Sequence, residues 1–228
     1  MQKRLVRKRD LELMLSKVEP HPAPTAELEQ YTISADTAAT MLYIAAYSHG
    51  NIVGKRVVDL GCGTGRLALG AAFMGAREVV GVDLDRTAVK KARENSADWN
   101  LKKKTQWIVA DIDSLRGRFD TVLQNPPFGV QKRGADREFI MKALELGSLV
   151  YSLHKRPHSD PSLVARLKAS SDGAVKVPAS SFMERFVDKN GGTIDTVYAL
   201  LMTIPHMFIF HNEKKHEFVT DLYVLRRK

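Results

Sequence analysis

The chain has 228 residues, 44% of them hydrophobic, which fits one domain with a sizeable core. Lys and Arg number 35 against 26 acidic residues, so the net charge of +9 favours a polyanionic partner such as nucleic acid, although it can also serve solubility alone. A single cysteine, Cys62, excludes an intrachain disulfide and a cysteine-built zinc site, and it favours a reducing compartment such as the cytoplasm.

No segment of the sequence is typical of a signal peptide or a membrane span. Residues 1–20 are basic and then amphipathic, without the apolar core of roughly 7 to 15 residues that a signal peptide needs. Residues 196–210 are the most apolar later stretch, but they are too short to span a bilayer and contain Pro205. We therefore expect a soluble protein, with an N-terminal extension at 1–27 and a single domain at 28–228.

Hydrophobic periodicity predicts the elements of the first half. Apolar residues at helical spacing predict a helix between Leu5 and Val18, ended by prolines, and a second helix from Ala35 to Gly50. Strands and helices then alternate, with helices at 65–76 and 86–101 and strands at 55–61, 78–85, 105–112 and 119–124. This alternation is typical of a doubly wound parallel sheet.

The second half predicts a helix at 134–148 and a fifth strand at 149–155. A polar stretch at 156–192 predicts one or two short helices and mobile loops. Two apolar segments, 193–205 and 216–228, are separated by HNEKK and predict a closing hairpin. The expected fold is α/β and Rossmann-like, a seven-stranded, mostly parallel sheet flanked by helices, with an antiparallel C-terminal hairpin.

A glycine-rich segment, DLGCGTG (59–65), follows the first predicted strand, where open α/β sheets bind ligands. Its spacing differs from that of dinucleotide and nucleoside triphosphate loops, and by itself it also fits a tight turn. Asp83 ends the second strand, where it can accept from both ribose hydroxyls, and Asp111 ends the third, where it can accept from an adenine amino group. Three strand-end acids without a phosphate cradle predict S-adenosylmethionine, with Asp59 and the loop amides holding its methionine portion. Cys62 is interpreted as a small loop residue.

The segment NPPF (125–128) ends the fourth strand at the same sheet edge. Its prolines stiffen the loop, and two acceptors, the Asn125 side chain and the Pro126 carbonyl, can take both protons of a flat amine. Phe128 offers a surface for stacking a ring, so catalysis is positioning of the amine, with no prior general base. We predict that the catalytic residues are Asn125, Pro126, Pro127 and Phe128. A proline-rich turn is the alternative for this motif in isolation.

With these motifs the chain resembles class I S-adenosylmethionine-dependent methyltransferases that carry an [ND]PP[YFW] signature. It is most similar to the archaeal and eukaryotic rRNA adenine-N(6) methyltransferases of the methyltransferase-like protein five family, through LEQY (28–31), DLGCGTG, NPPFG and VYSLHK. The resemblance implies methyl transfer to the 6-amino group of one adenosine in small-subunit rRNA. It adds Gln30 and Thr32 to the cofactor site, whereas Ile33 departs from the threonine of the family pattern. The full predicted cofactor site is Gln30, Thr32, Asp59, Gly61, Cys62, Gly63, Gly65, Asp83, Leu84, Asp111, Ile112 and Asn125.

The resemblance also implies a small zinc-binding activator subunit that pairs with an edge strand. The strand around Thr105 to Ile112 is the candidate, with Trp107 as the residue to test, although an ordinary half-buried strand is equally compatible with the sequence.

Basic residues follow two of the motifs, and we predict that they bind RNA in a salt-dependent manner, with solvated charge runs as the alternative: Lys132, Arg133, Lys155 and Arg156. Two other functions stay open. One is methylation of a protein glutamine amide, although that class usually has Tyr in place of Phe128. The other is a non-catalytic RNA-binding module.

Overall fold

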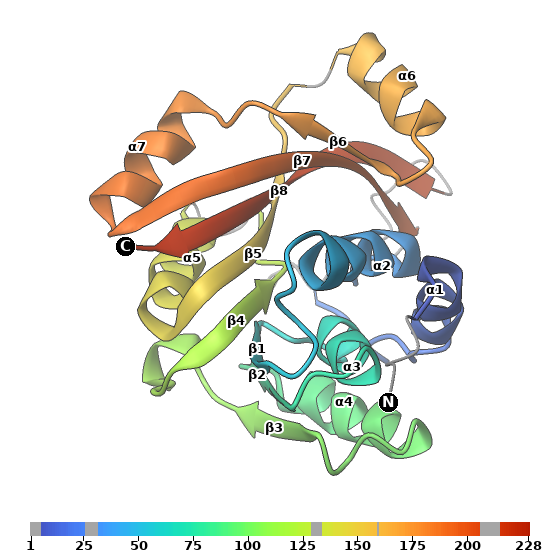
Figure 1. Cartoon of the computed structure of the whole chain (residues 1–228). Coiled ribbons are helices and arrows are strands. Elements are labelled where there is room, and N and C mark those ends of the chain that lie inside the picture. The colour runs from blue at the N-terminus through green and yellow to red at the C-terminus, as the bar shows by residue number, and fades with distance from the viewer. Residues whose placement is uncertain (1–5, 26–31, 129–133, 159, 206–214) are drawn as a thin grey trace.

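The computed structural model describes residues 6–25, 32–128, 134–158, 160–205 and 215–228. Within these ranges the strands are β1 (Arg56–Leu60), β2 (Glu78–Asp83), β3 (Thr105–Val109), β4 (Phe119–Gln124), β5 (Gly147–Lys155), β6 (Ala174–Val177), β7 (Gly192–Pro205) and β8 (Lys215–Arg227). All of them join one sheet in the order β3-β2-β1-β4-β5-β8-β7-β6 (Figure 1). The predicted Rossmann-like α/β fold is confirmed.

The helices of the same ranges are α1 (Lys8–Ser16), α2 (Ala35–Tyr43), α3 (Arg66–Phe73), α4 (Arg86–Asp98), α5 (Ala135–Leu146), α6 (Pro161–Ala169) and α7 (Ser181–Lys189). The helix predicted at 35–50 changes to a π turn at Ile44–Ser48. In this part of the chain, no helix has the length and apolar character needed to cross a membrane.

The parallel half of the sheet contains β1 to β5. β1 pairs with β2 on one side and with β4 on the other, so the direction of winding reverses between β1 and β4. The central strands are apolar on both faces because helices cover both. In such sheets the reversal leaves a crevice at the carboxyl ends of the strands, which is where ligands bind.

The antiparallel half has one strand more than predicted. β8 lies between β5 and β7, as a closing hairpin requires, and β6 pairs with β7 at the outer edge. Residues 174–177 form only four positions of strand, half-buried or exposed, between Gly173 and Pro178. Such a short segment has too little alternation to be recognised by periodicity. The two short helices predicted in this region are α6 and α7.

Two large hydrophobic clusters fill the two faces of the sheet. One joins α1, α2 and α3 to the face that carries Leu123 and Tyr151. The other joins α5 and α7 to the face that carries Val58 and Val122. α1 belongs fully to the first cluster, because Leu11 and Leu15 are completely buried, so the N-terminal segment packs on the core of the α/β fold (Figure 1).

Candidate active site

A cavity of about 400 Å³ lies at the carboxyl ends of the central parallel strands, where the winding reverses. Of the predicted site residues, it is lined by Thr32, Asp59, Gly61, Cys62, Gly63, Asp83, Leu84, Asp111, Ile112, Asn125 and Pro127. The other predicted residues within the described chain do not line it: Gly65, Pro126, Phe128, Lys155 and Arg156. Gln30, Lys132 and Arg133 lie outside the described residues.

The glycine-rich turn brings backbone close to the cavity. All three of its glycines have φ between 53° and 88°, a region that residues with a Cβ rarely adopt. The N–H of Cys62 donates to the Val82 carbonyl at 2.9 Å, and the N–H of Gly63 donates to the Asp83 carboxylate at 2.7 Å, which ties the turn to β2. Burial raises the pKa of the Cys62 thiol well above its usual value, so the thiol is a poor nucleophile.

Gly65 serves packing instead of lining the cavity. A Cβ at this position would lie 2.5 Å from Cη2 of Trp107, and a Cβ at Gly81 would lie 2.5 Å from Cζ3 of the same ring. The indole N–H of Trp107 donates to Ser96 Oγ at 3.3 Å. Trp107 therefore points inward beneath α4, and the absence of a side chain at Gly65 makes room for its ring.

Asp59 has the most unusual environment of the three acids. Its Oδ2 accepts the N–H of Ala68 at 2.9 Å, whereas its Oδ1 is buried and has no hydrogen-bond partner among the described residues. Burial raises the pKa of Asp59 to about 8, against the smaller opposing effect of the Ala68 hydrogen bond. This carboxyl is therefore mostly neutral at pH 7 unless a cation approaches Oδ1.

Asp83 and Asp111 are held by backbone donors. Asp83 Oδ1 accepts the N–H of Asp85 at 2.9 Å, and burial raises its pKa despite this bond and the one from the turn. Asp111 is exposed and accepts the N–H of Asp113 at 2.9 Å. Each acid ends or follows a different strand, so the structure brings together the three carboxylates that the sequence predicts at one edge.

Asn125 and Phe128 have different surroundings. Asn125 Oδ1 is buried and lacks a hydrogen-bond partner within the described residues, and Asn125 and Pro127 both line the cavity. The Phe128 ring meets the ring of Phe218 in β8 edge to face, with centroids 5.8 Å apart. Lys155 Nζ lies 5.5 Å from the centroid of Phe218. The NPPF segment is thus held by an aromatic residue 90 positions after Phe128 in the sequence.

A buried polar chain joins the two ends of the segment between β4 and α5. Gln124 Nε2 donates to Ser152 Oγ at 2.8 Å, and Ser152 Oγ lies 2.7 Å from His154 Nε2. His154 Nδ1 lies 3.6 Å from Asp136 Oδ2. Burial raises the pKa of Asp136, but the hydrogen bond and charge of His154 outweigh burial and lower it overall. Gln124 directly precedes Asn125, so these contacts anchor the start of the NPPF segment to β5 and to the first turn of α5.

Several cavity residues were not predicted as site residues: His21, Ile33, Thr64, Arg66, Leu67, Ala88, Ala110, Asp113, Ala135, Glu138 and Phe139. Ile33, whose departure from the family pattern left its role open, is 5% exposed and forms part of the wall. Thr64 lies within the predicted glycine-rich segment, and Arg66 directly follows it, so extending that motif by one residue would have included Arg66. Phe139 reaches the turn only through the packing of α5, since a Cβ at Gly61 would lie 3.0 Å from its ring.

His21 brings the N-terminal segment to the cavity. Its Nδ1 accepts the N–H of Ala23 at 3.0 Å, so the neutral ring carries its proton on Nε2, which donates to Asp85 Oδ2 at 2.9 Å. Asp85 also caps α4 by accepting the N–H groups of Thr87 and Ala88. No local pattern marks His21, because its partner lies 64 residues away.

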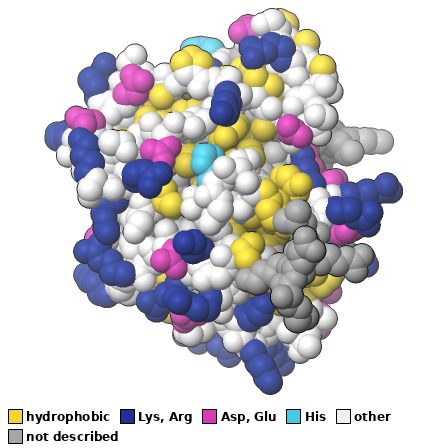
Figure 2. All heavy atoms as spheres, in the orientation of Figure 1, with side chains coloured by type: hydrophobic (Ala, Val, Ile, Leu, Met, Phe, Trp, Pro, Cys, Tyr) yellow, Lys and Arg dark blue, Asp and Glu magenta, His cyan; other side chains and the backbone are white. Residues whose placement is uncertain are grey.

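The predicted RNA-binding residues that the structure describes differ in exposure and in ion pairing. Lys155 is exposed at the end of β5, whereas Arg156 Nε is paired with Asp221 Oδ1 at 2.9 Å and its backbone N–H donates to the Val219 carbonyl. On the face shown in Figure 2, Lys and Arg side chains lie mostly along the margins. On this face the positive charge surrounds a more apolar centre and does not form a single stripe.

Comparison with known proteins identifies the family. Residues 34–148 match the model of the methyltransferase small domain. The rRNA N(6)-adenosine-methyltransferase METTL5 of Danio rerio is 32% identical over 219 residues, which cover 93% of this chain and 95% of that protein. An uncharacterized protein of Methanocaldococcus jannaschii is 34% identical over 98% of this chain and 95% of its own length. The crystal structure of a candidate RNA methyltransferase from Pyrococcus horikoshii has a TM-score of 0.80 at 35% identity, covering 98% of this chain and 99% of that chain. The chain therefore belongs to the METTL5 family of S-adenosylmethionine-dependent rRNA N(6)-adenosine-methyltransferases.

Proposed function

We propose that this chain transfers the methyl group of S-adenosylmethionine to the 6-amino group of an adenosine in small-subunit rRNA. The observation that carries the proposal is the buried, unpartnered Oδ1 of Asn125 in the cavity wall. A buried acceptor without a donor costs on the order of 1–3 kcal/mol, so it needs an explanation such as a ligand that supplies the donor. An exocyclic amine is such a donor, and the activity of the Danio rerio relative supports adenosine in rRNA as its source.

The cavity suits the cofactor at each of its parts. Asp83 is proposed to accept from the ribose hydroxyls and Asp111 from the adenine amino group. Leu84, which is 59% exposed, and Ile112 offer apolar surface to the adenine. The unpartnered Oδ1 of Asp59 suits the methionine ammonium, because a cation there replaces the missing hydrogen-bond partner.

The proposed mechanism is positioning of a weak nucleophile. When bound, the cofactor supplies an electrophilic methyl group on a positively charged sulfur. Asn125 Oδ1 and the Pro126 carbonyl accept the two protons of the adenine amine and turn its lone pair toward that methyl. Phe128, held by Phe218, stacks on the adenine ring. The nitrogen becomes acidic only as its new bond to carbon forms, so no side chain has to remove a proton beforehand.

An Asn125→Ala variant tests this role. N6-methyladenosine in small-subunit rRNA is measured by mass spectrometry of nucleosides after incubation with the purified enzyme. Removal of one oriented hydrogen-bonding group is expected to lower turnover by about 10²–10³-fold, by analogy with oxyanion-hole groups. Affinity for S-adenosylhomocysteine should stay within a few fold. Asn190→Ala, which removes an amide directly after α7, should leave both properties unchanged.

Two outcomes would contradict the proposal in different ways. Near-normal turnover by Asn125→Ala would remove Asn125 from the mechanism. Failure of the wild-type enzyme to form N6-methyladenosine in deproteinised rRNA, in ribosomal subunits and in the presence of its partner would remove the function itself.

For the RNA we propose contacts from Lys155 and Arg156 and from Lys132 and Arg133, with Arg156 exchanging its Asp221 partner for a phosphate. Basic side chains near the catalytic segment favour a polyanionic backbone at this edge. The proposed catalytic unit is a single domain at 28–228, with 1–27 as an extension whose helix α1 packs into the core of that domain. An rRNA substrate and a lone, buried cysteine favour the cytoplasm as the place of action.

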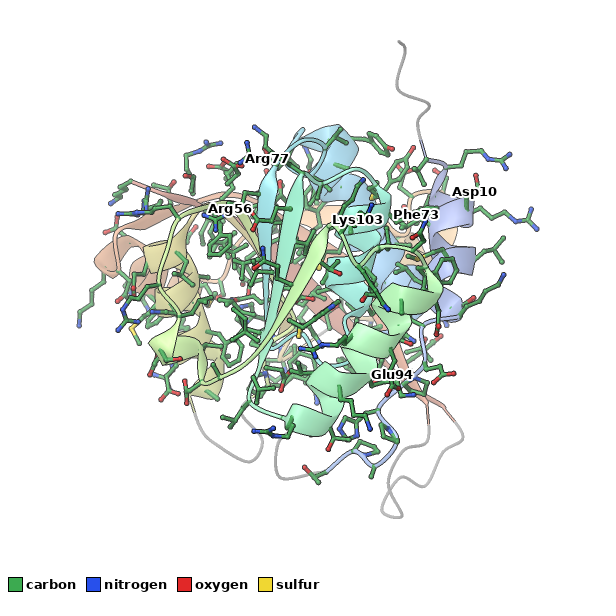
Figure 3. All side chains as sticks on the ribbon, turned by 90° about the horizontal axis from the view of Figure 1, so that it is seen from below. Asp10, Arg56, Phe73, Arg77, Glu94 and Lys103 are labelled. Atoms are coloured by element: carbon green, nitrogen blue, oxygen red, sulfur yellow. The ribbon has the colours of Figure 1, made fainter. Side chains whose placement is uncertain are left out.

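We also propose that a small zinc-binding activator pairs with β3. β3 ends the sheet, as the predicted edge strand should, and a hollow of about 560 Å³ lies between it and α4. Figure 3 shows this edge from outside, with Glu94 on α4 and Lys103 shortly before β3. Trp107 points inward and is not the residue to test, whereas Val109 is 43% exposed and available to a partner.

A further inference from the structure

Arg66 places a positive charge in the wall of the cofactor cavity. It is the first residue of α3, directly after the glycine-rich turn. Its Nη1 donates to the Ile33 carbonyl, and its Nη2 donates to the Val18 carbonyl at 3.1 Å. Both acceptors are neutral, so they leave the guanidinium charge without a counter-ion.

The charge of Arg66 is not balanced by any described side chain. Its Nε is buried and has no hydrogen-bond partner within the described residues, and no carboxylate of those residues contacts it. Burial lowers the pKa of Arg66, and no nearby acid offsets that effect. A buried charge is normally paired, because removing it from water without a partner is costly.

The wall of the cavity therefore contains one hydrogen-bond acceptor and one positive charge that have no partner among the described residues. Asp59 Oδ1 lacks a donor, and Arg66 lacks an anion. Among the described residues that line the cavity, Arg66 is the only lysine or arginine. The methionine portion of the cofactor carries both an ammonium and a carboxylate, and a guanidinium matches the geometry of a carboxylate.

We propose that Arg66 binds the carboxylate of the cofactor's methionine portion, while Asp59 faces the ammonium. The proposal rests on the proposed function, because it takes S-adenosylmethionine as the ligand of this cavity. Under this proposal Arg66 determines specificity, because a ligand that lacks the carboxylate gains no affinity from the guanidinium. Holding the Ile33 and Val18 carbonyls is a second, structural task of the same side chain, and the test has to separate the two.

The test compares two ligands that differ only in the carboxylate, S-adenosylmethionine and decarboxylated S-adenosylmethionine. Calorimetry measures the affinity of each for the full chain and for Arg66→Gln, which removes the charge but keeps a side-chain N–H donor. Hydrogen bonds to charged groups lead us to expect that Arg66→Gln weakens S-adenosylmethionine by about 10- to 100-fold. The decarboxylated ligand should keep its affinity within about twofold.

Two further variants sharpen the comparison. Arg66→Lys keeps the charge and should recover part of the preference for the carboxylate. Arg56→Gln removes another partly exposed arginine, paired with Glu78 at the opposite end of β1, and should change neither affinity (Figure 3).

Equal weakening of both ligands in Arg66→Gln would show a purely structural role and overturn the proposal, as would no weakening of either. If circular dichroism shows that Arg66→Gln is unfolded, the comparison rests on Arg66→Lys and on the wild-type protein. Equal affinity of the wild type for the two ligands would also contradict the proposal. A wild-type chain that binds neither ligand would instead refute the proposed function.

Discussion

The protonation of Asp59 depends on what lies beside it. In the protein alone, burial raises its pKa to about 8, so the carboxyl holds a proton at neutral pH. A methionine ammonium at Oδ1 favours the ionised form and lowers that pKa. Cofactor binding should therefore release a proton from this carboxyl.

We predict that the affinity for S-adenosylmethionine rises between pH 6 and 7.5, by up to about tenfold per pH unit. The direction of this pH dependence follows from the proton on Asp59. Below the pKa of about 8 the unbound protein carries this proton and the complex does not, so a higher pH favours binding. Calorimetry in buffers of different ionisation enthalpy counts the released protons. Asp59→Asn cannot release a proton and should bind with a flatter pH profile. A flat profile in the wild type would contradict the assignment.

How far the site was predictable depends on how each residue reaches it. Asp83, Asp111 and Asn125 end or follow strands, and parallel strands bring their carboxyl ends to one edge, so sequence position was sufficient. His21 and Phe139 reach the cavity through helix and segment packing, which no local pattern records. Side-chain directions were also beyond prediction, and Trp107, expected to face a partner, turned inward instead.

Among the elements, α1 connects the hydrophobic core with residues at the cavity. It belongs to the main hydrophobic cluster, and the residues after it, Val18 and His21, meet Arg66 and Asp85 at the cavity. Loss of α1 packing should therefore weaken both the fold and the cofactor site.

The helix offers a matched pair of leucines to test this. Leu15 is completely buried, whereas Leu13 in the same helix is 54% exposed. We expect Leu15→Ala to lower the free energy of unfolding by about 2–5 kcal/mol, as buried leucines do, and to weaken S-adenosylmethionine binding. Leu13→Ala should change stability by no more than about 0.5 kcal/mol. Denaturation in urea measures the difference, and equal effects of the two substitutions would mean that α1 does not contribute to the core.

The elements themselves were mostly predictable. Capping residues such as Asp85 and apolar strands bounded by glycine turns agree with the observed boundaries to within a few residues. β6 was missed because its four residues acquire their conformation from pairing with β7, an interaction that depends on the rest of the sheet. The π turn at Ile44–Ser48, which replaces the end of the helix predicted at 35–50, was also missed.

Taken as a whole, the molecule has a sheet with two different ends. The parallel end terminates at β3 and the antiparallel end at β6, and only the former adjoins the cofactor cavity. A protein that pairs with β3 would cover strand backbone that water otherwise solvates and would lie close to Asp111.

We expect Val109→Arg to abolish association with the proposed zinc-binding partner, because it introduces a bulky charge at the proposed interface. Met141→Arg on α5 is the matched control, since Met141 is 44% exposed and Val109 43%. The tagged chain is purified from cells that encode it, and its zinc content is measured by atomic emission. Wild type and Met141→Arg should retain zinc and a small subunit, and Val109→Arg should not. Zinc-free wild type, or retention by Val109→Arg, would contradict the pairing.

The position of β8 has a consequence for the way the protein is made. β8 follows every other strand of the sheet in the chain, yet it lies between β5 and β7 and pairs with both. A ribosome therefore has to complete all the neighbouring strands before the one that joins them emerges. Phe218, the brace of Phe128, arrives in that same last strand. A nascent chain that lacks it has no Phe218 to hold Phe128, so we expect the NPPF segment to take its final position only after β8 has been made.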